Sequence, residues 1–499
     1  MSRRLISQRL AAPFRAGIFA LLSLVLANSL ALGQSIGLNF DGINRFEGAA
    51  LSGNNGYAPP DNAGAVGQSH IVQLINGAFA VYDKSNGALL NATSGRQFWI
   101  DAGVDPGTGI SGLGAFNQRI LYDPNEDRWI AAALTADSVD NRVMLARSET
   151  SDPQGPWQAV SFLGNAGGTG RFVDYTALGI DANGIYVTTN NFTSISGSLD
   201  SVSVFSVPKA DLLAPTPSLA NMTRFDDLNS GSQPLIGWTL QPIVNHGAVG
   251  NHAPLLATDL VFTDTNLYRS DLMNTASAGA TMTIEATPIA VEQFTLPPLA
   301  AQPDGTRSIH LQDTRFKSNV VQVGDTIYAV HDVRIDDNAA IRWYKIDETT
   351  SEVIQSGTIS DPSFDFYQAS IAANSNGDVV IGFNRSGLGP DGQISIYAAL
   401  GSTLGDLTTF SDPFVLLAGT VVNYHYVNTR WGDYTTTVVD PFNPHVFWTF
   451  QEIPLANNAW TTHITQILVP EPASYLLASA AVVAFFVVAR RTRRRRAIQ

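Results

Sequence analysis

Short apolar runs rich in β-branched residues alternate with turn-forming residues along most of the chain. From about residue 60 onward, Gly, Asn, Asp and Pro recur at intervals of about eight to twelve residues. No stretch keeps a helical period of 3.6 with capping residues over a dozen positions. The pattern therefore predicts an all-β chain, with strands at residues 71–75, 142–146, 185–189, 201–205, 326–330, 378–383, 394–400 and 445–450.

One hairpin pattern recurs along this body. Residues 171–190 align with residues 430–450 as a strand, a Gly/Asn/Pro turn and a second strand, and weaker copies begin at Asp61, Phe116, Gln241, Arg315 and Phe366. The copies are about 50–75 residues apart, which suits a four-stranded antiparallel blade with a loop. We predict a β-propeller with seven blades; six or eight are alternatives because the copies at Asp61 and Gln241 are weak. A tandem of β-sandwiches is the rival fold, but it does not explain the recurrence.

The N-terminal segment has the features of a cleaved secretory signal. Four arginines lie within the first 15 residues, residues 16–32 are largely apolar, and Ala31 and Gly33 are small residues in front of Gln34. We predict a signal peptide at 1–33 and a propeller body at 34–468. Residues 34–60 are a candidate for one more strand that closes the ring.

The C-terminal segment resembles a short membrane anchor. Pro470, Glu471 and Pro472 precede fifteen residues without a charge, 475–489, and six arginines follow within residues 490–496. At 1.5 Å per residue a helix over this run is about 22 Å long, which is short for a membrane span. The arginines would stay on the cytoplasmic side.

This order of motif, apolar helix and basic end resembles the PEP-CTERM sorting signal of Gram-negative bacteria, here residues 469–499. The resemblance implies that an exosortase, a membrane-embedded cysteine transpeptidase, recognises Pro470, Glu471 and Pro472. It also implies export to the cell surface or extracellular matrix of bacteria that make exopolysaccharide and biofilm, with transient anchoring in the inner membrane. An ordinary C-terminal anchor that is never cut is the alternative.

The charge of the body limits its partners. Residues 34–468 keep 19 of the 29 Lys and Arg and 42 of the 43 Asp and Glu, a net charge of −23. Such a body is a poor match to nucleic acid or anionic lipid, so we predict no nucleic-acid partner. The chain has no cysteine, so disulfide bonds and thiolate metal sites are excluded.

The body resembles the sialidase-like and BNR-type propellers of exported bacterial proteins. Residues 151–157, Ser-Asp-Pro-Gln-Gly-Pro-Trp, are similar to a loosened Asp-box. In that motif we expect Asp152 to bind turn amides and Trp157 to fill the space between strands. The motif is structural in sialidases, so the resemblance concerns the fold.

Three arginines occupy the same position in three repeats. Arg171, Arg315 and Arg430 each stand at the entry to a hairpin, so they could ring one end of the central channel and bind a carboxylate. Asp174 and Asp433 follow two of them by three residues, which gives the alternative that each arginine pairs with a nearby aspartate or with a neighbouring blade. We take these five residues as the candidate ligand-binding set.

The sequence assigns no catalytic residue. Sialidase-type chemistry needs a Tyr nucleophile with a Glu partner and an Asp acid, and no such context is recognisable here. The leading hypothesis is therefore a non-catalytic surface or matrix protein that binds a glycan, such as exopolysaccharide, or another protein. The alternatives are a sialidase-like enzyme that uses the arginine cluster and a purely structural matrix component.

No metal-binding motif stands out, and we predict neither a metal nor a cofactor. The histidines are scattered without ligand spacing. Acidic turns at residues 123–127 and 336–338 have the oxygen ligands that Ca²⁺ prefers, although solvated turns have the same composition.

Overall fold

The computed structural model describes residues 35–470, apart from 110–111, 166–169, 230–235, 249, 261, 426–428 and 457. Residues Ile36–Gln466 form one compact unit. The predicted signal peptide, Glu471, Pro472 and the apolar run of the tail lie outside the described residues. Within the described ranges, no helix is long and apolar enough to cross a membrane.

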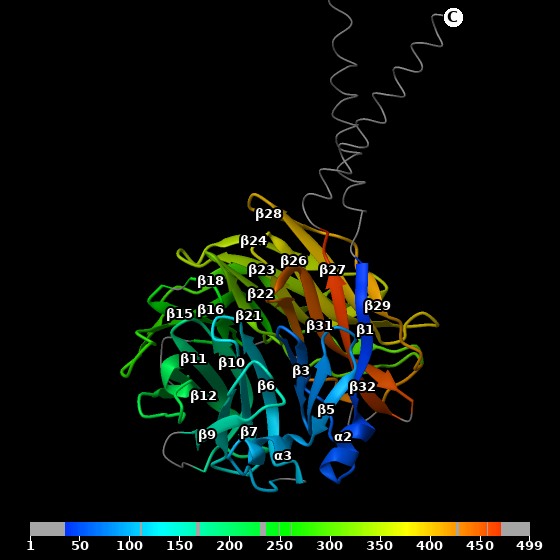
Figure 1. The fold of residues 1–499 in the computed structure, drawn as a ribbon. Coiled ribbons are helices and arrows are strands. Elements are labelled where there is room, and N and C mark those ends of the chain that lie inside the picture. Colours follow the sequence, from blue (N-terminus) through cyan, green and yellow to red (C-terminus); the bar gives the residue numbers. More distant parts are fainter. Residues whose placement is uncertain are drawn as a thin grey trace, which may run out of the picture. The chain divides into compact units, whose positions relative to one another are not determined.

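The chain folds into consecutive antiparallel groups of strands (Figure 1). Two four-stranded sheets come first in the repeat order, each with its strands in sequence order. Their strands are β2 (Ala63–Val66), β3 (His70–Ile75), β4 (Ala78–Asp83) and β5 (Leu89–Thr93), then β6 (Ala115–Asp123), β7 (Arg128–Thr135), β8 (Arg142–Ser148) and β9 (Trp157–Leu163).

A thirteen-stranded sheet follows, in which parallel pairs join three antiparallel groups: β10 pairs with β14, and β14 pairs with β21. The first group contains β10 (Phe172–Ile180), β11 (Gly184–Phe192), β12 (Leu199–Pro208) and β13 (Thr223–Leu228). The second contains β14 (Trp238–Val244), β15 (His252–Thr258), β16 (Thr263–Met273), β17 (Thr281–Ile284) and β18 (Ile289–Thr295). The third contains β21 (Val320–Val323), β22 (Thr326–Ile335), β23 (Asn338–Asp347) and β24 (Val353–Ile359).

Two further sheets complete the series. One contains β25 (Phe364–Ala373), β26 (Asp378–Gly387), β27 (Ser395–Leu404), β28 (Leu407–Phe410) and β29 (Phe414–Leu417). The other contains β30 (Thr436–Asp440), β31 (Asn443–Leu455), β32 (Ala459–Leu468) and, at its outer edge, β1 (Ser35–Asn44). A small two-stranded sheet pairs β19 (Ala300–Ala301) with β20 (Arg307–Ile309).

The first strand of each group contacts the first strands of its two neighbours, and the contacts form a closed cycle. The order is β2, β6, β10, β14, β21, β25, β30 and back to β2. Sheets that radiate from a cycle of inner strands define a β-propeller, so the prediction of an all-β propeller is confirmed. All eight predicted strand segments coincide with strands, namely β3, β8, β11, β12, β22, β26, β27 and β31, except that Ile394 lies one residue before β27.

The N-terminal strand closes the last sheet. In Figure 1 the blue β1 lies beside the red β32, although they are at opposite ends of the described chain. Thr462 donates its hydroxyl to the Ile43 carbonyl at 2.8 Å, and the His463 ring contacts Asp41 and Asn39 at 2.7 Å each. The expectation that residues 34–60 supply a closing strand is therefore confirmed.

The described residues also contain three short helices in the connections between strands, which the hydrophobic pattern did not predict. They are α2 (Arg45–Ser52), α3 (Gly95–Asp101) and α4 (Lys209–Leu212). The Asn44 side chain accepts hydrogen bonds from the first turn of α2 while Glu47 bonds back to the Asn44 amide, which is a capping box. Ser94 caps α3 through the Gln97 amide.

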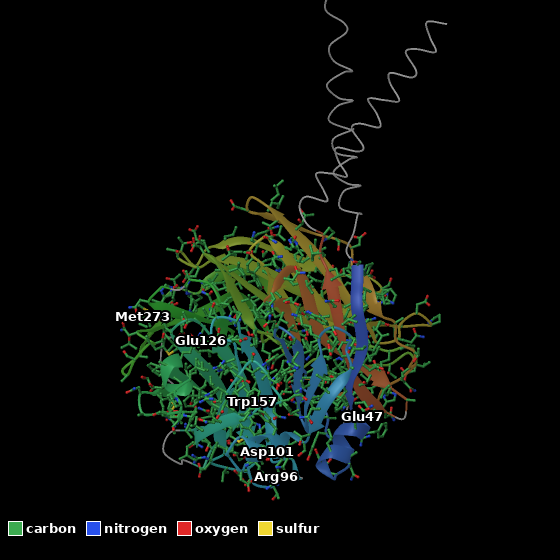
Figure 2. The ribbon with its side chains drawn as sticks, viewed as in Figure 1. Glu47, Arg96, Asp101, Glu126, Trp157 and Met273 are labelled. Carbon is green, nitrogen blue, oxygen red and sulfur yellow. The ribbon has the colours of Figure 1, made fainter. Side chains whose placement is uncertain are left out.

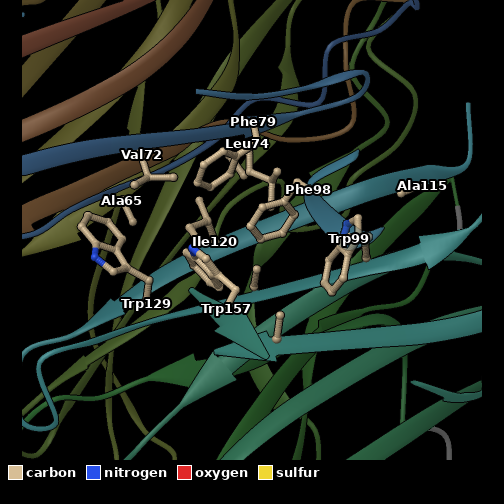
Figure 3. Packing of buried hydrophobic residues seen from close by; sticks show 14 of the residues in the cluster. Ala65, Val72, Leu74, Phe79, Phe98, Trp99, Ala115, Ile120, Trp129 and Trp157 are labelled. Atoms are coloured by element: carbon tan, nitrogen blue, oxygen red, sulfur yellow. The ribbon is translucent and has the colours of Figure 1, made fainter. Parts of the chain in front are cut away.

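Neighbouring sheets pack face to face through their apolar side chains. Figure 3 shows the interface between the β2–β5 and β6–β9 sheets, where Leu74, Phe79, Ile120 and Trp129 are buried together. Similar clusters fill the next interfaces, for example Leu145 against Val187. Because the chain has no disulfide, this burial supplies most of the stabilisation.

The hairpin turns repeat one local interaction. In five groups an Asp or Asn stands at the last position of the first strand or directly after it, and its side-chain oxygen accepts the backbone N–H two residues later, at 2.7–3.0 Å. This Asx turn reverses the chain before the second strand. The residues are Asp123, Asp181, Asn245, Asn374 and Asp440.

The inner strands share a second local feature, a bulge with a left-handed residue. In β6, β10, β14 and β25 the register skips two residues, and the first of the two has φ between 51° and 56°. Non-glycine residues rarely adopt this conformation, which costs about 1–3 kcal/mol each. The bulge residues are Asn117, Tyr175, Thr239 and Gln368. Each bulge re-aims a side chain where inner strands meet.

Candidate functional site

Charged and aromatic side chains gather where the inner strands begin, and we call this group the axial cluster. Its nine members lie on the inner strands or in the segments directly before them, and they come from five different repeats. They are Asp61, Arg119, Asp174, Tyr175, Asp313, Arg315, Arg430, Asp433 and Tyr434.

Arg430 is the most exposed cation of the cluster and is paired with a buried carboxylate. One guanidinium nitrogen donates to both Asp433 oxygens at 2.6 and 2.7 Å. The Arg430 side chain is 43% exposed, whereas that of Asp433 is 5% exposed. Gln312 also donates to the Asp433 carboxylate and to the Gly432 carbonyl. The expectation that an arginine pairs with the aspartate three residues later is confirmed for this repeat.

Arg315 lies beside the same centre but has its own partner. Its guanidinium donates to Asp313 at 2.7 Å and stands over the Tyr175 ring at 4.6 Å from the ring centroid. The positive charge of Arg315 also acts on Asp433. Arg315 and Arg430 are therefore brought together around one carboxylate.

Arg171 is oriented differently. Its guanidinium pairs with Asp200 at 2.6 Å and with Asp227, which lie on β12 and β13, the outer strands of its own group. The side chain thus extends along the end of its own sheet. Asp174, the expected partner in the sequence pattern, instead accepts a hydrogen bond from Asn117 on the neighbouring β6.

A third arginine that the sequence analysis did not single out occupies the centre. Arg119 on β6 lies 3.2 Å from the centroid of the Tyr434 ring and donates to the Thr176 carbonyl at 2.7 Å. The rings of Tyr175 and Tyr434 meet edge to face with centroids 6.2 Å apart. Arg119 stands in the weaker repeat copy that begins at Phe116, at a position that does not align with Arg171 or Arg430, so the repeat pattern did not single it out.

The hydroxyls of Tyr175 and Tyr434 each form a hydrogen bond to the backbone of another repeat. Tyr175 donates to the Phe316 carbonyl at 2.9 Å, and Tyr434 donates to the Gln118 carbonyl at 2.8 Å. Burial raises the pKa of each phenol above its usual range. These tyrosines are neutral hydrogen-bond donors that join repeats distant in sequence.

Two aspartates of the cluster have raised pKa values. Burial, followed by the negative charge of Asp433, raises the pKa of Asp61 to about 8 and raises that of Asp174. Asp61 accepts the Asp433 backbone N–H at 2.9 Å and the Asn76 amide at 2.8 Å. Burial acts against ionisation of Asp433 as well, but Arg430 and Arg315 hold its pKa below the usual value. The cluster therefore keeps two carboxylates that are paired with arginines, Asp313 and Asp433, and two carboxyls whose pKa values are raised, Asp61 and Asp174.

Acidic turns and histidines form no metal centre in the described part of the chain: no group of three or more His, Cys, Asp or Glu side chains is arranged to hold a metal ion there. In the turn at residues 123–127, the Asp123 carboxylate instead pairs with Lys209 at 2.6 Å.

The segment that resembles an Asp-box has the predicted structural role. The Asp152 carboxylate accepts the Gln154 backbone N–H at 3.0 Å, and the Trp157 indole donates to the Pro153 carbonyl at 2.9 Å. The Trp157 ring packs against Phe79 and Phe98 from the preceding group of strands.

Comparison with known proteins shows similarity of structure alone. No family model matches the chain, and no curated protein matches it in sequence. The extracellular domains 1–2 of Drosophila Semaphorin 1a are 11% identical over 88% of this chain and 89% of that one, with a TM-score of 0.40. A Trypanosoma rangeli sialidase is 10% identical over 74% of this chain, with a TM-score of 0.35, and the chain spans 57% of the length of that sialidase.

These similarities define no specific family. The TM-scores are low, so the β-propeller assignment rests on the strand order and on the closed cycle of inner strands. The strand order and the site define the protein as a β-propeller whose axial cluster contains Arg–Asp ion pairs.

Proposed function

We propose that this chain is an exported, non-catalytic, seven-bladed propeller of the cell surface or extracellular matrix, and that it binds acidic glycans at Arg430. The blade number is supported by the groups that begin at β2, β6, β10, β14, β21, β25 and β30, each with at least four strands. Strand β1 supplies the fourth strand of the last blade.

The exposure of Arg430 is the observation that carries the binding proposal. Its guanidinium is held in place by a buried carboxylate, yet nearly half of the side chain faces solvent. A fixed, planar donor array of this kind suits a carboxylate of the ligand, because little side-chain entropy is lost on binding. Arg315 adds positive charge beside it.

A non-catalytic role is favoured over the sialidase-like alternative by the same geometry. Arg171 is paired on the outer strands, so it does not join Arg315 and Arg430 in a three-arginine clamp. The hydroxyls of Tyr175 and Tyr434 are bonded to main-chain carbonyls, which leaves neither poised as a nucleophile.

Glycan-array binding by residues 34–468 tests this proposal. We expect the native body to bind acidic glycans and an Arg430→Gln variant to bind them at least about tenfold more weakly, since a charge-assisted hydrogen bond contributes about 1.5–3 kcal/mol. Arg171→Gln is the matched control, because it removes an arginine that is equivalent in sequence and ion-paired elsewhere.

The Arg430→Gln change leaves Asp433 buried without its ion-pair partner, so a second variant is required. An Arg430→Gln/Asp433→Asn pair removes both charges and keeps the fold testable. Acidic-glycan binding that both variants retain would place the binding site elsewhere. A native body that binds no glycan would favour a protein partner or a purely structural role.

The export route is the second part of the proposal. It is supported by the N-terminal basic and apolar segment and by Pro470, Glu471 and Pro472 in front of the apolar run. We propose an exosortase-type transpeptidase as the processing partner, with the inner membrane as a transient site of anchoring.

A further inference from the structure

A small pocket lies outside the axial cluster, at the junction of β5, α3 and the turn that leads into β9. Its volume is about 160 Å³. Drug-sized sites have volumes of about 300–1,000 Å³, so this pocket has room for about one ring. We call it the Trp157 pocket; Figure 2 labels Trp157 and Asp101 in this region.

Three aromatic rings form the floor of the pocket. Phe79 and Phe98 are stacked with centroids 4.4 Å apart and planes inclined by 13°. The Trp157 ring meets Phe98 edge to face at 5.0 Å, and its indole N–H is bonded to the Pro153 carbonyl. Figure 3 shows Phe79, Phe98 and Trp157 together among the buried residues of this core. The floor is therefore rigid and apolar.

Polar side chains form the rim. Those of Asn91, Thr93 and Gln154 line the pocket, and none of them has a hydrogen-bond partner among the residues that the structure describes. The Asp101 carboxylate also lines it and accepts one hydrogen bond, from Gln97 at 2.7 Å. Amides, a hydroxyl and a carboxylate are thus available above an aromatic floor, the combination that fixes the orientation of a small ligand.

We propose that the Trp157 pocket binds a single neutral pyranose unit of a polysaccharide. A pyranose has an apolar C–H face that can pack on the small exposed parts of Phe79, Phe98 and Trp157, which are 3%, 5% and 8% exposed. Its hydroxyls can pair with the amide and carboxylate groups of the rim. The charge selects a neutral sugar, because the Asp101 carboxylate in the rim repels a sugar acid or a phosphate. An extended apolar ligand does not fit, because the rim is polar and the cavity small.

This site is independent of the axial cluster and differs from it in ligand charge. Arg430 presents a cation to acidic sugars, whereas the Trp157 pocket presents neutral amides and one carboxylate. A polysaccharide with both neutral and acidic units has two distinct places to bind on one molecule, which raises its overall avidity.

The test is calorimetric titration of the full-length chain, purified in mild detergent, with neutral hexose and pentose oligosaccharides. The variant Asn91→Ala/Gln154→Ala removes two rim amides and leaves the aromatic floor intact. We expect its dissociation constant for the bound sugar to rise about tenfold, because each lost hydrogen bond weakens binding severalfold. Thr93→Trp covers the pocket from the edge strand β5 and should abolish binding.

Gln68→Ala is the matched control, since Gln68 is an exposed amide at the β2–β3 turn of the same sheet, away from the pocket. Its affinity should equal that of the native chain. Unchanged affinity in both pocket variants overturns the proposal, as does a native chain that binds none of the neutral sugars. Far-ultraviolet circular dichroism verifies that each variant is folded.

Discussion

Three aspartates surround the guanidinium of Arg430, and each contributes to its raised pKa. One cation cannot compensate three buried carboxylates, so Asp433, which makes the direct hydrogen bonds, is the one that stays ionised. Asp61 and Asp174 have raised pKa values because they are buried beside the Asp433 charge. The axial cluster is therefore sensitive to pH around neutrality.

An Asp61→Asn variant should lose part of the pH dependence of stability. The pKa of Asp61 is about 8 in the folded protein and about 3.9 in an unfolded chain. Its stabilising contribution is therefore complete below about pH 4 and is lost as the pH rises towards 8, with a slope of up to about 1.4 kcal/mol per pH unit. Urea unfolding between pH 5 and 9 should show a shallower decline for the variant.

Asp325 is exposed, so an Asp325→Asn variant shows how far the loss of any one negative charge changes the pH dependence of the free energy of unfolding. Identical slopes for native chain and Asp61→Asn would contradict the assignment of a protonated Asp61 at neutral pH.

The residue-level predictions from sequence succeeded where the partner is close in the chain. Arg430 and Asp433 are three residues apart, and their pairing was among the expected alternatives. The partners of Arg171 lie on β12 and β13, and the ring over Arg119 belongs to Tyr434 in another repeat. Contacts of this kind depend on how the sheets are placed around the axis, which neither periodicity nor spacing encodes.

At the scale of the element, the Asx turns explain why the repeats were recognisable. The Asp or Asn at the end of five of the first strands has a fixed structural task, so it recurs where other residues diverge. The helices α2 and α3 were not predicted because they are only one or two turns long. The capping box from Asn44 to Glu47 was nevertheless readable as a helix start.

Two of the turn aspartates also join neighbouring sheets by pairing with a lysine, which is buried in one case and partly buried in the other. Asp123 pairs with Lys209 at 2.6 Å, with side chains 1% and 5% exposed, and Asp440 pairs with Lys84 at 2.7 Å. Removing one partner leaves a buried charge without compensation. The first pair connects the end of β6 to α4, which follows β12, and the second connects the end of β30 to the turn after β4.

We therefore expect Lys209→Ala to lower the free energy of unfolding by about 3–5 kcal/mol. The comparison is Arg96→Ala, which breaks the Arg96–Asp105 pair whose side chains are 34% and 62% exposed, and which should cost below about 1 kcal/mol. Chemical denaturation of both variants measures the difference. Equal losses would show that burial of the Lys209 pair has no energetic consequence.

At the scale of the whole molecule, the closing strand links the two ends of the body. Strand β1 covers β32, which would otherwise present an unpaired edge. The bonds between them, such as Thr462 to Ile43, span 419 residues. The last sheet is thus complete only when both ends of the body are present.

Deletion of Ser35–Asn44 should destabilise the body and promote aggregation, since it exposes the β32 edge. We expect a clear fall in the melting temperature together with increased light scattering on heating. A truncation after Pro470, which leaves every described strand in place, is the control and should melt like the native body. A deletion variant with native melting would contradict the role of β1 in closure.

The proposed export route makes a prediction about the C-terminus of the mature chain. Intact-mass measurement of material recovered from the cell surface should show loss of the apolar run and the arginines. Glu471→Ala should leave the tail in place and retain the chain in the inner membrane. Surface material that still carries the full tail would indicate a permanent anchor instead.

The pairing of β1 with β32 also sets an order of events during biosynthesis. The strand made first must wait for the strand made last, and at about 5–20 residues per second the intervening 419 residues take roughly 20–80 s to synthesise. Throughout this interval the nascent chain lacks its final sheet, so the ring stays open until translation is nearly finished. The ring therefore closes only when synthesis is almost complete. Under the proposed export route, a chain that is still unclosed could be threaded through a translocation pore without first being unfolded.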